Sequence, residues 1–296
     1  MTIRSNVEFE GEDGVILRGW LYRPEGSGLK PAITMAHGFA AVKEHGLDSF
    51  ARAFAAEGFI VLVHDHRNFG TSEGTPRHDI DPWRQIADWR RAITFLEMQP
   101  GVAPDRIGIW GTSFAGGHAI VLGATDRRLS CVVAQVPTIS GYDQGQRRVS
   151  PDATASLEAA FAEDERQPFR GGAPRRTRVV SSDLDEPAAY RSPDAIDFYT
   201  QVSARETWVN DVTLRSTRAA RSYEPGPWAP RVSPTPLLLV VALRDTVTVT
   251  DLALRAYENA LEPKRLVTIR GGHFSPYETE FQAASSAALA WFTNNL

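Results

Sequence analysis

Short, uninterrupted runs of hydrophobic residues alternate along the chain with segments in which hydrophobic residues recur every three or four positions. Runs of the first kind are typical of strands buried on both faces, and segments of the second kind of helices with one buried face. Strands are therefore predicted at 31–36, 59–63, 129–136, 236–243 and 265–269, with another through Ile107 and Ile109. Helices are predicted at 48–57, 82–97, 114–122 and 251–261, and a last one from a capping box at Ser275.

The regular alternation of strand and helix predicts an α/β fold with a mostly parallel central sheet and helices on both faces. Two further strands, at 7–10 and 15–22, are joined through Asp13-Gly14, a hairpin signal. After Pro137 the alternation stops, and the chain becomes rich in arginine, proline and acidic residues for too long a stretch to be one loop. We predict a core at 1–139, an inserted, mainly helical cap at 140–232, and the rest of the core at 233–296.

Composition narrows the class of protein. The chain has 296 residues, of which 42% are hydrophobic and 23% charged, the balance of a soluble globular protein. Its net charge of −4 implies no general attraction to nucleic acid or to a membrane. The N-terminus lacks a signal segment, no run is long enough to span a bilayer, and the single cysteine, Cys131, excludes an intrachain disulfide. We expect a cytoplasmic protein; its oligomeric state stays open, with a homodimer as one option.

One serine stands on a sharp turn between a predicted strand and a predicted helix. Ser113 lies between Gly111 and Ala115, and two more glycines follow. Such a turn strains the serine backbone and lifts its hydroxyl above the sheet, which requires small neighbours. Similar stretches also arise by chance in turns rich in serine and glycine, so residues elsewhere in the chain are needed to identify a catalytic site. We take Ser113 as a candidate nucleophile.

Two residues that a serine nucleophile requires follow the last two predicted strands. Asp245 comes just after the strand at 236–243, and His273 follows the strand at 265–269 after two glycines. A serine hydroxyl needs an adjacent imidazole to take its proton and a carboxylate to hold that imidazole. Because ligands bind at the carboxyl ends of strands in open α/β sheets, the three side chains are expected to meet there as a catalytic triad.

Asp251 is the rival for the acid of this triad. The segment from Thr248 to Asp251 has the form of a capping box. We therefore expect Asp251 to cap the helix at 251–261 and Asp245 to orient the histidine.

An acyl-transfer site also needs donors for the oxyanion. On such a turn they come from the residue after the nucleophile, here Phe114, and from the loop after an early strand, here Phe39. His37 is expected to fix that loop by a hydrogen bond and is also a candidate substrate contact. Aromatic residues of the predicted cap either line a substrate pocket or form the core of the cap. We take three of them as candidate substrate contacts: Trp208, Tyr223 and Trp228.

Other patterns carry weaker signals. His64 and His66 flank Asp65, but side chains two positions apart at a strand end point to opposite faces, so we predict no metal site. No glycine-rich phosphate loop is present, and we predict no cofactor. The arginines between 147 and 178 are balanced by acidic residues, which indicates a solvated surface; the alternative is a docking site for an acyl-carrier protein or a CoA phosphate.

These motifs together resemble those of the α/β-hydrolase superfamily. The resemblance rests on His37-Gly-Phe39, Asp65 to Gly74, Ile80-Asp-Pro-Trp83, Gly111 to Ala115, Asp245 and Gly271-Gly-His-Phe274. More narrowly, they are similar to the dienelactone-hydrolase-like and Xaa-Pro-peptidase-like branch, and within it to the fungal polyketide transferase and thiohydrolase group. The likeness covers nearly the whole chain outside the predicted cap. It implies the fold and the triad, whereas the substrate depends on the cap and pocket.

We interpret the sequence as that of a serine hydrolase. It would cleave a carboxylic ester, thioester or lactone of a small acyl substrate through an acyl-enzyme on Ser113. Three alternatives stay open. An acyltransferase or thiohydrolase would act on a polyketide acyl group with the same triad, and an aminopeptidase-like amidase would cleave aminoacyl amides. A non-catalytic binding module on this fold would commonly lack a member of the triad, and here all three candidates are present.

Overall fold

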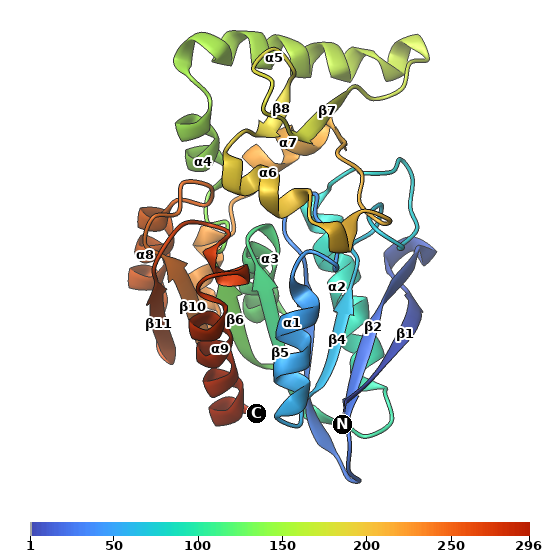
Figure 1. Cartoon of the computed structure of the whole chain (residues 1–296), viewed down its shortest axis with the longest axis vertical. Coiled ribbons are helices and arrows are strands. Elements are labelled where there is room, and N and C mark those ends of the chain that lie inside the picture. The colour runs from blue at the N-terminus through green and yellow to red at the C-terminus, as the bar shows by residue number, and fades with distance from the viewer. Residues whose placement is uncertain (1) are drawn as a thin grey trace.

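The computed structural model describes residues 2–296, and in that range a single eight-stranded sheet forms the centre of the molecule (Figure 1). Its strands are β1 (Thr2–Glu10), β2 (Ile16–Pro24), β3 (Lys30–Ala36), β4 (Ile60–His64), β5 (Val102–Thr112), β6 (Leu129–Gln135), β10 (Leu237–Ala242) and β11 (Lys264–Ile269). They lie in the order β1-β2-β4-β3-β5-β6-β10-β11. The strand β2 pairs antiparallel with both its neighbours, and all the other pairs are parallel. Every strand except β2 therefore has its carboxyl end at the same edge of the sheet.

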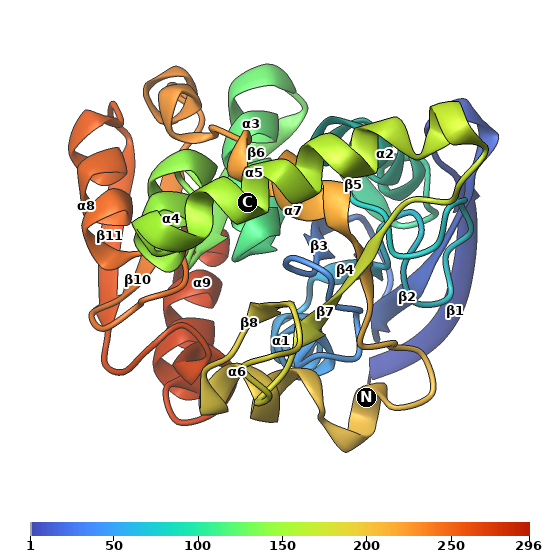
Figure 2. The same ribbon diagram turned by 90° about the horizontal axis from the view of Figure 1, so that it is seen from above.

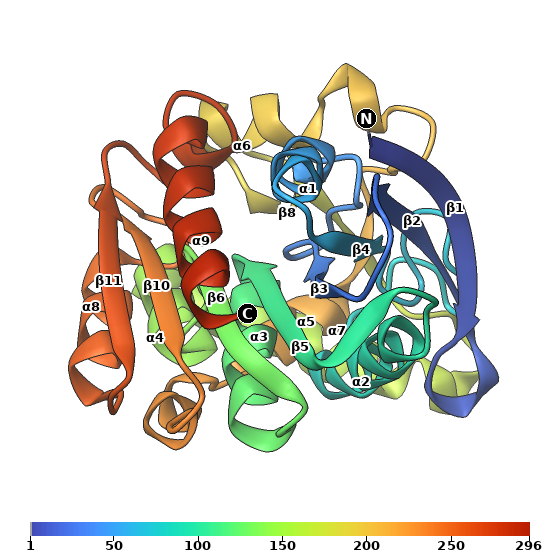
Figure 3. The same cartoon turned by 90° about the horizontal axis from the view of Figure 1, so that it is seen from below.

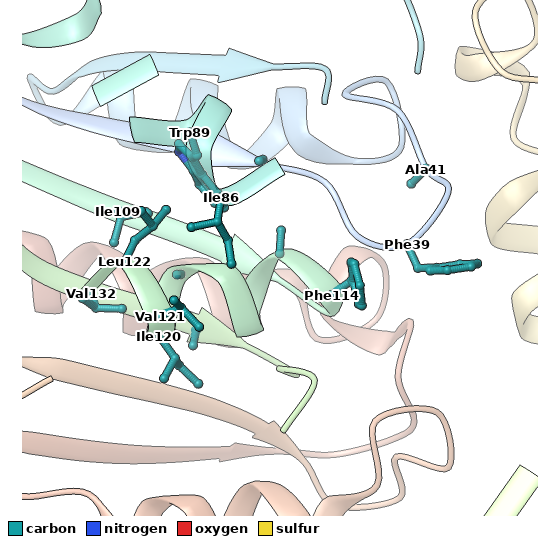
Figure 4. Packing of buried hydrophobic residues seen from close by; sticks show 14 of the residues in the cluster. Phe39, Ala41, Ile86, Trp89, Ile109, Phe114, Ile120, Val121, Leu122 and Val132 are labelled. Atoms are coloured by element: carbon teal, nitrogen blue, oxygen red, sulfur yellow. The ribbon is translucent and has the colours of Figure 1, made fainter. Parts of the chain in front are cut away.

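Helices cover both faces of the sheet, as Figure 3 shows from below. One face carries α1 (Leu47–Ala56) and α9 (Phe281–Asn295), and the other carries α2 (Pro82–Glu97), α3 (Phe114–Thr125) and α8 (Thr250–Asn259). Each face buries its own hydrophobic cluster, and part of the larger one is drawn in Figure 4. These layers confirm the predicted α/β fold. Within residues 2–296, no helix combines the length and the hydrophobicity needed to cross a bilayer.

A long insertion separates β6 from β10 and lies over the carboxyl ends of the strands (Figures 1 and 2). It holds α4 (Gly141–Arg148), α5 (Pro151–Arg166), α6 (Pro193–Tyr199) and α7 (Leu214–Arg221). It also holds a three-stranded sheet, in the order β8-β7-β9, that the sequence did not predict: β7 (Arg176–Val180), β8 (Ala188–Tyr190) and β9 (Val212–Thr213). These strands are short, and β7 begins with exposed arginines, so they lack the hydrophobic run by which the core strands were recognised.

Helix starts show where local signals were reliable and where they were not. Asp81 caps α2 as expected, because its side chain accepts the N–H groups of Trp83 and Arg84. The prediction that a capping box at Ser275 opens the last helix was wrong. Residues Ser275–Tyr277 form a short 3-10 helix (η5), and the α-helix begins only at Phe281. The hydroxyl of Ser275 instead accepts the N–H of Gly272, which pins the loop before His273.

Candidate active site

The turn between β5 and α3 consists of Ser113 alone. Its backbone has a φ of +56°, a conformation that residues other than glycine rarely adopt and that concentrates at functional sites. Small neighbours permit this turn. A Cβ at Gly111 would lie 2.1 Å from the backbone oxygen of Ala115, and a Cβ at Gly38 would lie 2.9 Å from the Cβ of Ser113. Because these neighbours are glycines, backbone atoms can pack closely around the strained serine.

His273 lies between Ser113 and Asp245, although the three come from distant segments. Its Nε2 is 2.9 Å from the Oγ of Ser113, and its Nδ1 is 2.8 Å from Oδ2 of Asp245. All three side chains are buried. With the proton on Nδ1 donated to the carboxylate, Nε2 is free to accept the proton of the serine hydroxyl, the arrangement that nucleophilic catalysis by serine requires.

The carboxylate of Asp245 is held by a short turn of its own. It accepts the N–H groups of Val247 and Thr248 at 2.8 and 2.9 Å and the hydroxyl of Thr248 at 2.8 Å. Burial by itself raises the pKa of Asp245, but the charge of His273 and the hydrogen bonds from His273 and Thr248 outweigh it, so this pKa lies below its ordinary value. The carboxylate is therefore ionised and fixed opposite the imidazole.

Asp251 does not cap α8, which corrects the prediction made for it. The residue before that helix is Val249, and no side chain caps its N-terminus. Asp251 lies within the first turn and forms a two-pronged ion pair with the exposed Arg147, at 2.6 and 2.9 Å. A local motif suggested the cap, whereas a residue of the insertion, remote in sequence, supplies the actual partner.

The loop after β3 places Phe39 against Phe114, the first residue of α3, with their ring centroids 5.8 Å apart (Figure 4). His37 holds the start of this loop. Its Nε2 lies 3.1 Å from the backbone nitrogen of His66 and accepts that N–H, so Nδ1 carries the proton and donates to the oxygen of Gly38 at 3.0 Å. Burial lowers the pKa of His37, which keeps the ring neutral and suited to this role.

Asp65 anchors the same loop from the core side and was not singled out as a site residue from the sequence. It is buried and accepts the backbone N–H of Lys43 at 2.8 Å, the ammonium group of Lys43, and the N–H of Thr71 at 3.0 Å. Burial raises the pKa of Asp65, but the charge of Lys43 more than offsets this, and the net shift is downward. Its position directly after a buried strand was the signal that could have found it.

A cavity of about 10 Å³ lies beside Ser113, room for little more than one water molecule. Core residues form most of its wall, including His273, Phe274 and Tyr277, and α6 of the insertion closes it with Phe198 and Tyr199. Phe274 and Tyr277 were not named as site residues from the sequence, although they flank the histidine. Since no acyl group fits in this volume, the structure is that of a closed site.

The three aromatic residues chosen as substrate contacts lie elsewhere among the described residues. Trp208 stacks on Tyr199 at 5.7 Å and donates its Nε1–H to the oxygen of Ala40. The hydroxyl of Tyr223 lies 2.9 Å from Nδ1 of His118. Trp228 packs under the guanidinium of Arg231. None of the three lines the cavity beside Ser113. Their contact with substrate stays a prediction for an opened site.

His64 and His66 lie side by side, with ring centroids 5.4 Å apart, so the expectation that they point to opposite faces was wrong. The alternation of side chains holds only within a strand, and β4 ends at His64. The rings of His37 and His118 pack against His66 as well, at 4.7 and 5.6 Å. In the part of the chain that the structure describes, no group of three or more His, Cys, Asp or Glu residues is arranged to hold a metal ion.

The buried histidines make stability depend on pH. Burial lowers the pKa of His64 to about 3 and that of His118 to about 3, whereas an exposed histidine titrates near 6.5. These histidines therefore bind protons in the unfolded chain but stay neutral in the folded chain. The free energy of unfolding consequently falls as the pH drops below about 6.5. We expect His64→Phe, which packs against the same aromatic rings, to flatten this dependence between pH 7.5 and 5 in urea denaturation. Equal slopes in both proteins would contradict the assignment.

Together, the parallel sheet and the strained serine on its strand-to-helix turn are those of the α/β-hydrolase fold. A family model described as X-Pro dipeptidyl-peptidase (S15 family) matches residues 13–275, and the chain belongs to this family. It is 34% identical to Thiohydrolase aneE of Aspergillus aculeatus over 88% of this chain and 83% of that protein. It is 32% identical to Polyketide transferase ATR5 of Stachybotrys chlorohalonatus over 92% and 90% of the two chains.

The solved structures agree with the family. The crystal structure of the α/β hydrolase GrgF from Penicillium sp. sh18 matches with a TM-score of 0.85 at 26% identity, covering 99% of each chain. These similarities confirm the predicted superfamily and branch. The protein is an enzyme, an α/β-fold serine hydrolase.

Proposed function

We propose that the protein cleaves a carboxylic ester or thioester through an acyl-enzyme on Ser113. The observation that carries this proposal is the chain of hydrogen bonds from the Oγ of Ser113 through His273 to the carboxylate of Asp245. His273 takes the serine proton as Oγ attacks the carbonyl carbon, and then gives that proton to the leaving alcohol or thiol. In the second half, a water molecule attacks the acyl-enzyme while His273 takes a proton from that water. His273 then returns this proton to the Oγ of Ser113 as the acid is released.

In this mechanism the oxyanion of each tetrahedral intermediate accepts the backbone N–H groups of Phe39 and Phe114. Phe114 is the residue after the nucleophile at the start of α3, where the helix dipole also favours negative charge. Loss of one such donor typically costs about 2.7–4 kcal/mol of barrier. The close approach of Gly38 to Ser113 supports the placement of Phe39, since it brings the loop backbone against the nucleophile.

The substrate in this proposal is a small acyl thioester or ester, with residues 140–232 acting as the cap. The relative Thiohydrolase aneE supports a thioester. The arginines of the insertion favour a solvated surface over a phosphate-docking site, because most are ion-paired with acidic side chains. These include Arg147 with Asp251, Arg170 with Glu163, Arg176 with Asp211 and Arg178 with Glu186.

A second candidate function is transfer of a polyketide acyl group to an alcohol. The likeness to Polyketide transferase ATR5 favours it, and so does the closed cavity, because a transferase must keep water from the acyl-enzyme. Incubation of the protein with acyl thioesters, with and without an alcohol acceptor, separates the two by product analysis. Free acid as the product in both cases supports hydrolysis, and ester formed only with the acceptor supports transfer. Cleavage of aminoacyl anilides in preference to both esters and thioesters would contradict the proposal and identify an amidase.

A further inference from the structure

The loop that carries Phe39 has a strained backbone. Ala40, the next residue, has a φ of +51°, in the left-handed region that favours glycine. A residue with a side chain keeps such a conformation only where the surrounding structure determines it. The contacts that hold the backbone of Phe39 and Ala40 matter for catalysis, because the N–H of Phe39 is a proposed oxyanion donor.

Two side chains from the insertion bind the carbonyl groups on either side of this strained position. The hydroxyl of Tyr199 donates to the backbone oxygen of Phe39 at 2.6 Å, and the indole N–H of Trp208 donates to the oxygen of Ala40 at 2.8 Å. The two rings stack on each other, with centroids 5.7 Å apart. Both contacts join residues that lie more than 150 positions apart in the sequence.

A third contact ties the loop back to Tyr199. The Nδ1 of His45 accepts the N–H of Val42 at 3.1 Å, so its Nε2 carries the proton and donates to the backbone oxygen of Tyr199 at 3.1 Å. Tyr199 therefore binds this loop through its hydroxyl and through its main chain. Burial raises the pKa of Tyr199 well above its ordinary value, which keeps the hydroxyl protonated and able to donate.

These hydrogen bonds limit the orientation of the Phe39 N–H. The planar peptide group that contains this N–H also contains the carbonyl of Gly38, which His37 holds by a hydrogen bond. The following peptide group contains the carbonyl of Phe39, which Tyr199 holds. With both planes fixed, the two backbone dihedrals of Phe39 are fixed as well.

We propose that Tyr199 is a positioning residue for the oxyanion hole. Its hydroxyl holds the Phe39 carbonyl, and thereby the Phe39 N–H, in the orientation that meets the tetrahedral intermediate. This inference rests on the acyl-enzyme function proposed above. Because Tyr199 also lines the cavity beside Ser113, one residue of the insertion both closes the site and completes the hole. The hole is therefore fully formed only when α6 lies over the serine, which couples oxyanion stabilisation to exclusion of water.

The test is Tyr199→Phe, which removes the hydroxyl and keeps the stacked ring. We expect kcat for an activated acyl ester to fall by roughly 10- to 100-fold, because a misplacement of about 1 Å can cost 10²-fold. KM should change by less than about twofold, since the hole binds the intermediate more strongly than the substrate. The affinity for an aryl trifluoromethyl ketone, whose hemiketal adduct with serine carries an oxyanion, should fall by the same factor as kcat/KM.

Tyr22→Phe is the matched control. It also removes a buried tyrosine hydroxyl with a 2.6 Å hydrogen bond, here to Asp48, but on β2, three strands along the sheet from β5. We expect its kcat to stay near that of the unmodified enzyme. Equal losses in the two variants, or a rise of KM alone in Tyr199→Phe, would overturn the inference.

The ketone also separates this inference from the function on which it rests. Binding that is lost in Ser113→Ala and weakened in Tyr199→Phe supports both. Binding that requires Ser113 and is unchanged in Tyr199→Phe contradicts only the role of Tyr199. Ketone affinity and ester turnover that survive in Ser113→Ala contradict the acyl-enzyme mechanism itself.

Discussion

Replacing Ser113 by alanine is expected to abolish ester and thioester turnover, with a fall in kcat on the order of 10⁶-fold. The mechanism has no other nucleophile, and what remains is catalysis by the oxyanion donors and by substrate binding. The fold should persist, because the substitution removes one hydroxyl from a turn whose neighbours are already small. Steady-state kinetics and the circular dichroism spectrum measure the two effects separately.

Ser285→Ala is the matched control for that experiment. Ser285 is buried in α9, and its hydroxyl donates to the backbone oxygen of Gln282. We expect this variant to keep wild-type kcat. Turnover in Ser113→Ala within tenfold of the unmodified enzyme would reject Ser113 as the nucleophile.

Replacing Asp245 by asparagine is expected to lower kcat by about 10⁴-fold, the size seen when an orienting aspartate of this kind is changed. An amide presents N–H to Nδ1 of His273 in place of an acceptor, which favours the tautomer that cannot take the serine proton. The imidazolium that forms during the reaction also loses its counter-charge. Steady-state kinetics on the same ester measure the loss.

Asp251→Asn is the control for the acid, because it was the rival candidate in the sequence. Its partner is the exposed Arg147, and an exposed pair of this kind is worth about 0–1 kcal/mol of stability. We expect kcat of Asp251→Asn to stay within about twofold of the unmodified enzyme. A larger loss of kcat in Asp251→Asn than in Asp245→Asn would reassign the acid.

The sequence was most informative where one physical rule governs distant segments. Uninterrupted hydrophobic runs marked the core strands, and parallel strands must present their carboxyl ends at one edge. The polar residues directly after those runs, Ser113, Asp245 and His273, are therefore brought within hydrogen-bonding distance in the structure. No knowledge of the packing was needed to nominate them.

Prediction was least successful where the partner of a residue lies in another segment. The capping box at Asp251 failed for this reason, because Asp251 binds the distant Arg147. The one at Ser275 failed locally, because its hydroxyl accepts the N–H of Gly272, three residues earlier. The role inferred for Tyr199 is of the same kind, since nothing near it in the sequence indicates a hydrogen bond to Phe39. The small sheet of the insertion was missed because β8 and β9 have only three and two residues and β7 begins with exposed arginines.

Labelling with a fluorophosphonate, followed by mass mapping of the modified peptide, tests whether Ser113 is the activated nucleophile. Such a probe phosphonylates a serine that an adjacent imidazole activates and whose developing oxyanion is stabilised. We expect one label per chain, on Ser113. Labelling should be absent after heat denaturation and strongly slowed in Asp245→Asn. A protein that turns over esters while Ser113 stays unmodified, or that carries the label on another residue, would contradict this role of Ser113.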